Sequence, residues 1–261
     1  MEKEVQTDVT KNIENIETQR IEPTQLEVVQ NDALTIEEIE TGLVYNGSMV
    51  RVADISEEFR KVIEPILRMY NAAMNVTTAR IEIIKDESSY KNVRCPVHHI
   101  DTRLKSAGSI LGKLQKKNLD LTIGAACNNI YDIAGVRIVC PYIKDVYFIR
   151  DRILAQDDIE VMKVKDYIEH PKENGYRSYH LIIRVPVFFM NKKQMVPVEI
   201  QIRTMAMDLW ASLEHDISYK AINSKGEYQG DYSEFREELT ECSRLIYEAE
   251  EKMERMNSML E

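Results

Sequence analysis

Two short stretches in which apolar and polar residues alternate place the strongest constraint on how this chain folds. Residues 135–140 read Gly-Val-Arg-Ile-Val-Cys, and residues 198–204 read Val-Glu-Ile-Gln-Ile-Arg-Thr. A period of two is typical of β-strands, because successive side chains leave a strand in opposite directions. In the second stretch the aliphatic side chains share one face, while Glu199, Gln201 and Arg203 share the other. We therefore predict two strands with the core on one face and a polar site on the other.

The polar face of these strands carries residues that suit a magnesium nucleotide. Asp132 lies just before the first strand, and Arg137 lies within it. With Glu199 and Arg203 they supply carboxylates that hold a divalent cation and guanidinium groups that bind phosphate or lie against a base. The alternative is an ordinary half-exposed strand with a solvated face, and the pattern by itself leaves both interpretations open.

The composition excludes several classes of protein. A chain of 261 residues that is 44% hydrophobic and 30% charged is typical of a soluble globular protein, and no apolar run reaches the roughly 20 residues that a membrane helix needs. The first residues lack the basic and then apolar order of a signal peptide, so we expect a cytoplasmic protein. The four cysteines include no Cys-x-x-Cys pair, which predicts reduced thiols. The net charge of −10 argues against a broad surface for nucleic acid.

Periodic segments divide the chain into an extension, one domain and a last helix. Residues 1–50 are acidic and lack sustained periodicity, which predicts a flexible extension. A helical pattern begins near Asp54, and Pro65 within it predicts a kink or a helix that restarts there. We expect one domain over 51–225 and a C-terminal helix for packing or oligomerisation in 226–261. Further strands are expected at 99–105, 135–142, 160–168, 181–189 and 194–204, and further helices at 106–117, 144–155, 205–219 and 233–260.

Three of these helices carry informative faces. On 106–117, Ser109 and Lys113 share one face, where a polyanion can lie, although a solvated lysine face is the alternative. On 205–219 we expect three residues on the core side, namely Trp210, Leu213 and Ile217. The helix 233–260 carries a loose apolar stripe, which predicts a packing or oligomer surface.

The stretch 171–180, Pro-Lys-Glu-Asn-Gly-Tyr-Arg-Ser-Tyr-His, has the most unusual composition. Asn174 and Gly175 mark a tight turn, so a hairpin tip is one interpretation. The other interpretation is a purine nucleotide site, because hydrogen-bond donors surround an aromatic ring and a stacked base contributes roughly 1–3 kcal/mol. Those polar and aromatic residues are Lys172, Asn174, Tyr176, Arg177 and His180.

Five ordered motifs over about 97–222 resemble those of the small alarmone synthetases, which are single-domain relatives of the RelA/SpoT enzymes. The motifs are Arg103-Leu-Lys105 with Ser109 and Lys113, Asp132-Ile-Ala-Gly-Val-Arg137, Lys165-Asp166 leading to Pro171-Lys172-x-Asn174-Gly175-Tyr176-x-Ser178-x-His180, Glu199-Ile-Gln201-Ile-Arg203-Thr204, and Trp210-x-x-x-Glu214-His215. The resemblance implies an α+β fold with a nucleotidyltransferase-like mixed five-stranded sheet flanked by helices. It also implies a GTP pyrophosphokinase of the stringent response, which transfers the β,γ-pyrophosphate of ATP to the 3′-hydroxyl of GTP or GDP and makes AMP and (p)ppGpp.

The resemblance also implies a role for each matching residue. Arg103 and Arg137 are expected to sandwich the adenine of ATP, and Tyr176 to stack on guanine. Asp132 is expected to bind Mg²⁺, and Glu199 to act as the base or as a second magnesium carboxylate. The residues expected to hold the ATP phosphates are Lys105, Ser109 and Lys113. The other residues expected around the acceptor nucleotide are Lys165, Lys172, Asn174, His180 and Gln201.

Departures from the family pattern, and two alternatives, qualify this expectation. His99 and Asp101 stand where tetrameric relatives have a Phe-x-Thr pair for allosteric alarmone binding, so we expect no such allosteric site. Family analogy implies a homotetramer that synthesises the alarmone without hydrolysing it, and the preference between GTP and GDP stays open. One alternative keeps the chemistry but pyrophosphorylates tRNA. The other is a catalytically silent regulator that binds nucleotides or RNA.

Overall fold

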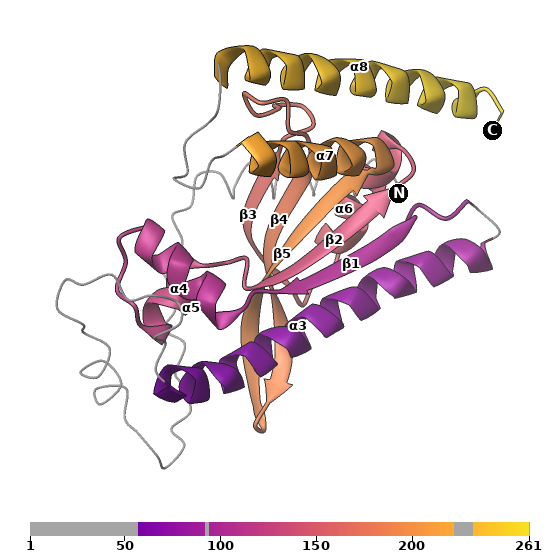
Figure 1. Cartoon of the computed structure of the whole chain (residues 1–261). Helices are drawn as coiled ribbons and strands as arrows, with labels where there is room; N and C mark the ends of the chain where they lie inside the picture. The colour runs from indigo at the N-terminus through magenta and orange to yellow at the C-terminus, as the bar shows by residue number, and fades with distance from the viewer. Residues whose placement is uncertain (1–56, 92–93, 222–231, 261) are drawn as a thin grey trace.

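A five-stranded mixed sheet with helices around it forms the centre of the molecule (Figure 1). The computed structural model describes residues 57–91, 94–221 and 232–260. The strands are β1 (His99–Leu104), β2 (Ala134–Cys140), β3 (Glu160–Asp166), β4 (Tyr179–Phe189) and β5 (Lys192–Thr204). Their spatial order is β1-β2-β5-β4-β3, in which β2 and β5 run parallel and the other neighbours are antiparallel. This architecture confirms the predicted fold class, whereas the predicted extension 1–50 and the helix start near Asp54 lie outside the described residues.

The helices are α3 (Glu57–Tyr90), α4 (Ala107–Lys116), α5 (Ile123–Asn129), α6 (Ile143–Leu154), α7 (Met205–Ala221) and α8 (Tyr232–Ser258). Helix α3 continues through Pro65, so of the two alternatives predicted for that residue, a kink or a restarting helix, the restart is wrong. A proline inside a helix removes one backbone hydrogen bond. The burial of apolar side chains along the same helix, such as Tyr70 and Ile81, offsets that loss.

The apolar face of the sheet is covered by α3 and α6. Val198, Ile200 and Ile202 of β5 are completely buried, and they join the buried residues of both helices in one core. The two helices are also linked at their edges, because Arg80 of α3 pairs with Asp158, just beyond the end of α6. The opposite face of β2 and β5 therefore remains available for polar side chains.

Helices α7 and α8 pack against each other at one end of the sheet (Figure 1). Trp210 of α7 is buried as predicted, but Leu213 is 52% exposed and Ile217 is 43% exposed, so the predicted core side of α7 is wrong for both. Only the side of α7 that faces the sheet and α8 is covered, because α7 crosses the end of the sheet. The predicted apolar stripe of the last helix consists of Phe235, Leu239, Ile246, Met253 and Leu260. Its last part does not pack, since Met253 of α8 and Leu260, just beyond the end of α8, are exposed.

Two further expectations concern the whole chain. None of the helices in the described part is long and apolar enough to cross a membrane. All four cysteines are free, in line with the predicted reduced thiols.

Candidate active site

Strand register brings the predicted site residues onto one face of the sheet. The parallel pairing of β2 and β5 sets Gly135 opposite Glu199 and Arg137 opposite Gln201. The antiparallel pairing of β1 and β2 sets Arg103 opposite Gly135. Residues that are about 100 positions apart in the sequence therefore share one surface.

The first group on this surface is a lysine–aspartate cluster formed by Lys105, Lys113 and Asp132. The ammonium group of Lys113 lies 2.7 Å from Asp132 Oδ2, and that of Lys105 lies 3.2 Å from the same oxygen. Lys105 directly follows β1, and Lys113 projects from α4, whose N-cap is Ser106. The backbone of three neighbouring elements thus holds two cations around one carboxylate.

The charge state of Asp132 follows from its surroundings. Burial alone would raise the pKa of Asp132, but its contacts with Lys113 and Lys105 outweigh that effect and lower the pKa. The carboxylate is therefore ionised at neutral pH. Its second oxygen, Oδ1, is buried and has no hydrogen-bond partner. An unpartnered carboxylate oxygen beside two ammonium groups suits a ligand that combines a cation with phosphates.

The other residues that we expect to bind ATP lie beside this cluster and make no hydrogen bond with it. Ser109 is exposed, and its hydroxyl lies 2.9 Å from that of Ser106, the N-cap residue of α4. Arg103 is exposed on β1, and the side chain of Arg137 on β2 is 39% exposed. Both guanidinium groups are therefore accessible from solvent on the polar face.

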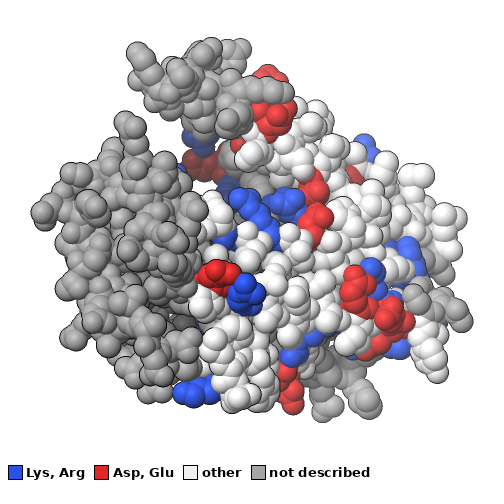
Figure 2. All heavy atoms as spheres, turned by 60° about the horizontal axis from the view of Figure 1, so that its bottom comes forward, with Lys and Arg blue, Asp and Glu red and all other residues white. Residues whose placement is uncertain are grey.

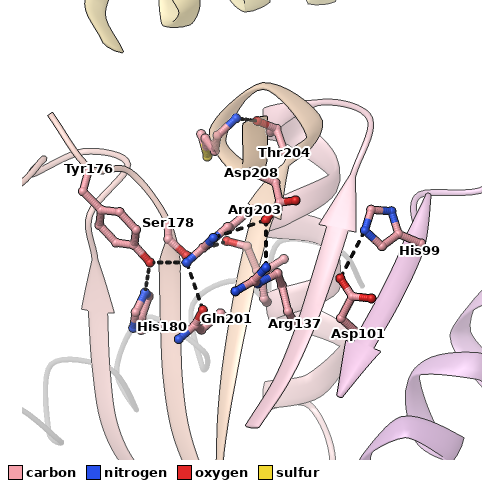
Figure 3. Close-up of polar contacts among 12 residues, drawn as sticks. His99, Asp101, Arg137, Tyr176, Ser178, His180, Gln201, Arg203, Thr204 and Asp208 are labelled. Carbon is pink, nitrogen blue, oxygen red and sulfur yellow. Dashed lines mark hydrogen bonds and ion pairs between the residues drawn. The ribbon is translucent and has the colours of Figure 1, made fainter. Parts of the chain in front are cut away.

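The second group is a closed hydrogen-bonded ring of five side chains from β4, β5 and the loop before β4. Gln201 Nε2 donates to Glu199 Oε2 over 3.0 Å, and Arg203 Nη2 donates to Gln201 Oε1 over 3.0 Å. Arg203 Nη2 also donates to the hydroxyl of Tyr176 over 2.7 Å. That hydroxyl lies 2.8 Å from His180 Nε2, and His180 Nδ1 lies 3.5 Å from Glu199 Oε1, which closes the ring. Figure 3 shows Tyr176, His180, Gln201 and Arg203 directed toward one another.

Burial and hydrogen bonding set the charges within this hydrogen-bonded ring. Burial lowers the pKa of His180 in spite of its contact with Glu199, so the imidazole is neutral at neutral pH. Neutral His180 can donate from Nδ1 to Glu199 and accept at Nε2 from the Tyr176 hydroxyl. Burial would raise the pKa of Glu199, but its hydrogen bonds with His180 and Gln201 lower it. Glu199 is therefore an oriented, ionised acceptor.

Asp208 of α7 connects the hydrogen-bonded ring to the neighbouring strand. Its Oδ1 atom lies 3.2 Å from Arg203 Nη1 and 3.3 Å from Arg137 Nη1 (Figure 3). Sequence reasoning missed Asp208, and it predicted that the Arg203 guanidinium binds phosphate or lies against a base, without a bond to Tyr176 or Asp208. The alternation along β5 placed Arg203 on the polar face, but nothing in the sequence marks Asp208, which depends on how α7 turns back over the strand.

The end of β3 and the loop between β3 and β4 carry the remaining predicted residues. Lys172 Nζ lies 4.6 Å from the ring centroid of Tyr176 and 4.9 Å from that of Tyr167, which belongs to the same family motif but was given no role. Lys165 Nζ lies 5.5 Å from the ring centroid of Tyr167, and Asn174 Oδ1 accepts from the backbone N–H of Tyr176. Because β3 and β4 are antiparallel neighbours, the stretch is a hairpin connection that also gathers cations around aromatic rings.

Comparisons with known proteins place this arrangement among related chains. Residues 102–224 match the model of a region found in RelA / SpoT proteins. The chain is 41% identical over 187 residues to the GTP pyrophosphokinase YwaC of Bacillus subtilis, and the match covers 72% of this chain and 86% of that protein.

Two solved structures have the same overall fold. The small alarmone synthetase 2 from Bacillus subtilis is 40% identical, with a TM-score of 0.64 over 74% of this chain and 97% of that one. The small alarmone synthetase 1 from Bacillus subtilis, bound to its product pppGpp, is 28% identical, with a TM-score of 0.67 over 78% of this chain and 98% of that one.

Proposed function

This chain belongs to the RelA/SpoT family as a small alarmone synthetase, and from that premise we propose that it is a GTP pyrophosphokinase. In this reaction the β,γ-pyrophosphate of ATP passes to the 3′-hydroxyl of GTP or GDP, with AMP and (p)ppGpp as products. The observation that carries the proposal is the presence of two different polar groups on one face of the sheet. The lysine–aspartate cluster suits a polyphosphate, and the hydrogen-bonded ring suits a nucleoside whose hydroxyl must lose a proton.

We assign the donor nucleotide to the side of the lysine–aspartate cluster. Lys105 and Lys113 neutralise the phosphates of ATP, with Ser109 beside them at the start of α4. Arg103 and Arg137, both accessible on the polar face, lie against the adenine. Phosphoryl transfer depends mainly on positioning and charge neutralisation, which these cations supply.

We assign Mg²⁺ to the carboxylates Asp132 and Glu199. Magnesium in phosphoryl-transfer sites is usually held by one or two carboxylates together with substrate phosphates. The unpartnered Oδ1 of Asp132 fits this pattern. Repulsion from Asp132 acts to raise the pKa of Glu199, as burial does, so the two carboxylates influence each other. When bound, the ion would neutralise charge on the transferred pyrophosphate.

We assign the acceptor nucleotide to the side of the hydrogen-bonded ring. Tyr176 offers its ring to guanine, and the exposed Lys172 beside that ring can move aside or pair with a phosphate. The 3′-oxygen of the acceptor attacks the β-phosphorus of ATP, and its proton passes to Glu199. The bond from that phosphorus to the oxygen that bridges to the α-phosphorus then breaks, which releases AMP. The other residues assigned to the acceptor are Lys165, Asn174, His180 and Gln201.

The setting of the enzyme forms part of the proposal. We propose that it works in the cytoplasm, as a homo-oligomer that is a tetramer by family analogy, with the synthetase domain at 51–225 between the extension 1–50 and the helical segment 226–261. Four apolar side chains spaced along one stripe of α7 support an oligomer, since each is between 43% and 55% exposed. They are Met205, Leu209, Leu213 and Ile217.

The experiment that tests the proposed function incubates the protein with γ-labelled ATP and GTP, GDP, GMP or tRNA in turn. We expect label to appear on GTP and GDP. Label on tRNA alone would overturn the guanine-nucleotide assignment, and transfer to none of these acceptors would favour a silent nucleotide-binding regulator. The side of the molecule drawn in Figure 2 makes the tRNA outcome less expected, since the Lys and Arg side chains of its described residues form small groups, mostly with Asp and Glu beside them, and no broad basic surface.

A further inference from the structure

Helix α8 holds the loop that carries the proposed guanine-binding residues. Ser243 Oγ donates to the backbone carbonyl of Gly175 over 2.5 Å. The hydroxyl of Thr240 lies 3.1 Å from the backbone carbonyl of Glu173 and 2.9 Å from that of Arg236 in its own helix. Two successive turns of α8 therefore face carbonyl groups of the loop 171–178.

The loop and the helix fit closely at Gly175. This glycine has φ +86°, a left-handed conformation that side chains rarely adopt, and a Cβ atom there would lie 2.7 Å from Ser243 Cβ. Ser243 is buried, with 6% of its surface exposed. Beside it, the Arg177 guanidinium lies 4.1 Å from the ring centroid of Tyr247 in α8. The absence of a side chain at Gly175 is thus what allows the backbone to reach the hydroxyl of Ser243.

Helix α8 is itself fixed to the sheet layer by contacts away from the loop. The carboxylate of Glu254 accepts from the backbone N–H groups of Ile143 and Lys144, both over 3.2 Å, at the first turn of α6. Trp210 of α7 donates from Nε1 to the backbone carbonyl of Leu239 over 3.1 Å. Contacts with α8 therefore fix the loop relative to the strands that carry the hydrogen-bonded ring.

The loop has few hydrogen bonds of its own to maintain its shape. Its backbone pairs Gly175 N–H with the Lys172 carbonyl over 2.8 Å, and Lys172 N–H with the Tyr176 carbonyl over 3.1 Å. Ordering a loop when a ligand binds reduces affinity, and a loop that is already ordered avoids that loss. External contacts from α8 are therefore well placed to preserve the arrangement of Lys172, Asn174 and Tyr176 before a nucleotide arrives.

We propose that α8 positions the loop 171–178 for the guanine nucleotide, with Ser243 as the main positioning residue and Thr240 as a second one. This inference rests on the proposed function, because it assigns the acceptor to this loop. Neither hydroxyl touches the nucleotide. Both act through the backbone carbonyls that they hold, so their loss affects acceptor binding and leaves ATP binding unchanged.

The kinetic test compares the full-length protein with Ser243→Ala, Thr240→Val and the double variant. A net hydrogen bond corresponds to roughly a 2- to 12-fold change in an equilibrium constant, so we expect the double variant to raise the KM for GTP about tenfold. The KM for ATP should stay within about twofold. Thr240→Ser keeps the hydroxyl, so its KM for GTP should stay at the wild-type value. Ser258→Ala is the matched control, because the Ser258 hydroxyl donates only within α8, to the carbonyl of Glu254.

A second measurement separates this inference from the proposed function. Hydrogen exchange in the nucleotide-free protein should be faster at the loop amides in the double variant, and unchanged in the strands and in Ser258→Ala. Unchanged loop exchange would overturn the positioning role, whatever the activity. Faster exchange with equal KM values for GTP, or with equal rises for GTP and ATP, would overturn it too. If the wild-type protein transferred no pyrophosphate to guanine nucleotides, the proposed function would fail, and nucleotide-binding measurements on the same variants would decide the positioning role.

Discussion

The hydrogen-bonded ring and the lysine–aspartate cluster lie on the same face of the sheet, but they are built in different ways. In the ring, each of five side chains contacts two others, and the Arg203 side chain is only 6% exposed. In the cluster, two lysines on separate elements contact one oxygen of Asp132, and the Lys113 side chain is 36% exposed. The ring therefore has a fixed geometry before any ligand binds, whereas the cluster consists of charges on flexible side chains.

This difference fits the proposed assignment of one nucleotide to each group, because the two nucleotides would make different demands on the protein. A hydroxyl that must be deprotonated requires an acceptor in a defined orientation, and under the proposed assignment Glu199 of the ring would be that acceptor. A polyphosphate requires positive charge with less exact geometry, which lysines supply as they adjust to the ligand. Changes within the ring should consequently disturb several neighbours at once, and changes within the cluster should act one charge at a time.

The largest effect is expected for Glu199→Gln, which removes a negative charge from the ring while keeping the size of the side chain. An amide neither takes the proton of a 3′-hydroxyl at neutral pH nor holds Mg²⁺ as a carboxylate does, so kcat should fall by at least about 10²-fold. Nucleotide affinities and the melting temperature should change little. Steady-state kinetics and calorimetry check this, with Gln194→Ala on the same strand as control. Normal turnover in a folded Glu199→Gln protein would show that the hydrogen-bonded ring does not take the proton from the acceptor hydroxyl.

The next effect concerns Tyr176, which takes part in the ring through its hydroxyl and offers its aromatic ring for stacking. Tyr176→Ala should raise the KM for GTP by roughly 5- to 100-fold, from the loss of a stacked base, with the KM for ATP nearly unchanged. Tyr176→Phe keeps the stacking surface but loses the bonds to His180 and Arg203. It should therefore affect kcat more than the KM for GTP. An equal loss of ATP affinity in Tyr176→Ala would contradict the assignment of GTP to the hydrogen-bonded ring and of ATP to the lysine–aspartate cluster.

A smaller effect is expected in the lysine–aspartate cluster. Lys113→Ala removes one of two ammonium groups, and Lys105 remains 3.2 Å from Asp132 Oδ2, so the KM for ATP should rise only about fivefold. The KM for GTP should not change. Lys193→Ala removes the same charge at an exposed position of the β4–β5 hairpin and serves as the control. A 10²-fold loss in kcat from Lys113→Ala would mean that the cluster is as rigidly coupled as the ring.

The smallest effect concerns Glu250, a carboxyl of α8 beneath the loop that supports the ring. Its two oxygens are buried without a hydrogen-bond partner, and burial raises its pKa from 4.5 to about 7, with repulsion from Glu254 and Glu251 adding to the rise and the nearby Thr204 and Arg177 opposing it. The native protein keeps a proton that the unfolded chain releases at lower pH. The stability that depends on this proton is complete below pH 4.5, decreases as the pH rises to about 7 and is lost above that.

Glu250→Gln replaces the protonated carboxyl with a neutral group of the same shape. It should raise the melting temperature at pH 8 by roughly 2–8 °C, from roughly 1–2 kcal/mol of relieved burial of charge, and change it little at pH 5. Thermal melts at the two pH values check this, with the exposed Glu238→Gln as control. An equal shift at both pH values would show that Glu250 does not titrate in this range. This substitution should not change the KM for ATP, which we assign to the lysine–aspartate cluster.

The fold was predictable where local patterns decide the structure. Period-two alternation located the strands, because it depends on neighbouring residues alone. Leu213 and Ile217 were misjudged because their burial depends on whether another element covers α7. The short helix α5 was missed because seven residues carry too little periodicity to be distinguished from a loop.

The candidate site was predictable to a lesser extent. Alternation along β5 placed Glu199, Gln201 and Arg203 together, and family resemblance supplied the roles that stay predictions until they are tested. The closure of the ring through Tyr176 depends on the path of the loop before β4, which no local pattern specifies. The contribution of α8 depends on contacts between residues that are 67 and 68 positions apart, which a single sequence does not reveal.

The hydrogen bond from Trp210 to the carbonyl of Leu239 also has a practical consequence for spectroscopy. Trp210 is the only tryptophan in the chain and is 5% exposed, and the centroid of its indole ring lies 6.4 Å from the centroid of the Tyr176 phenol ring. Indole emission shifts to longer wavelength when the ring becomes solvated, so the emission maximum of the unlabelled enzyme reports whether α8 is docked. If a nucleotide binds at Tyr176 as proposed, the native fluorescence of Trp210 can be used to follow the binding, without any added dye.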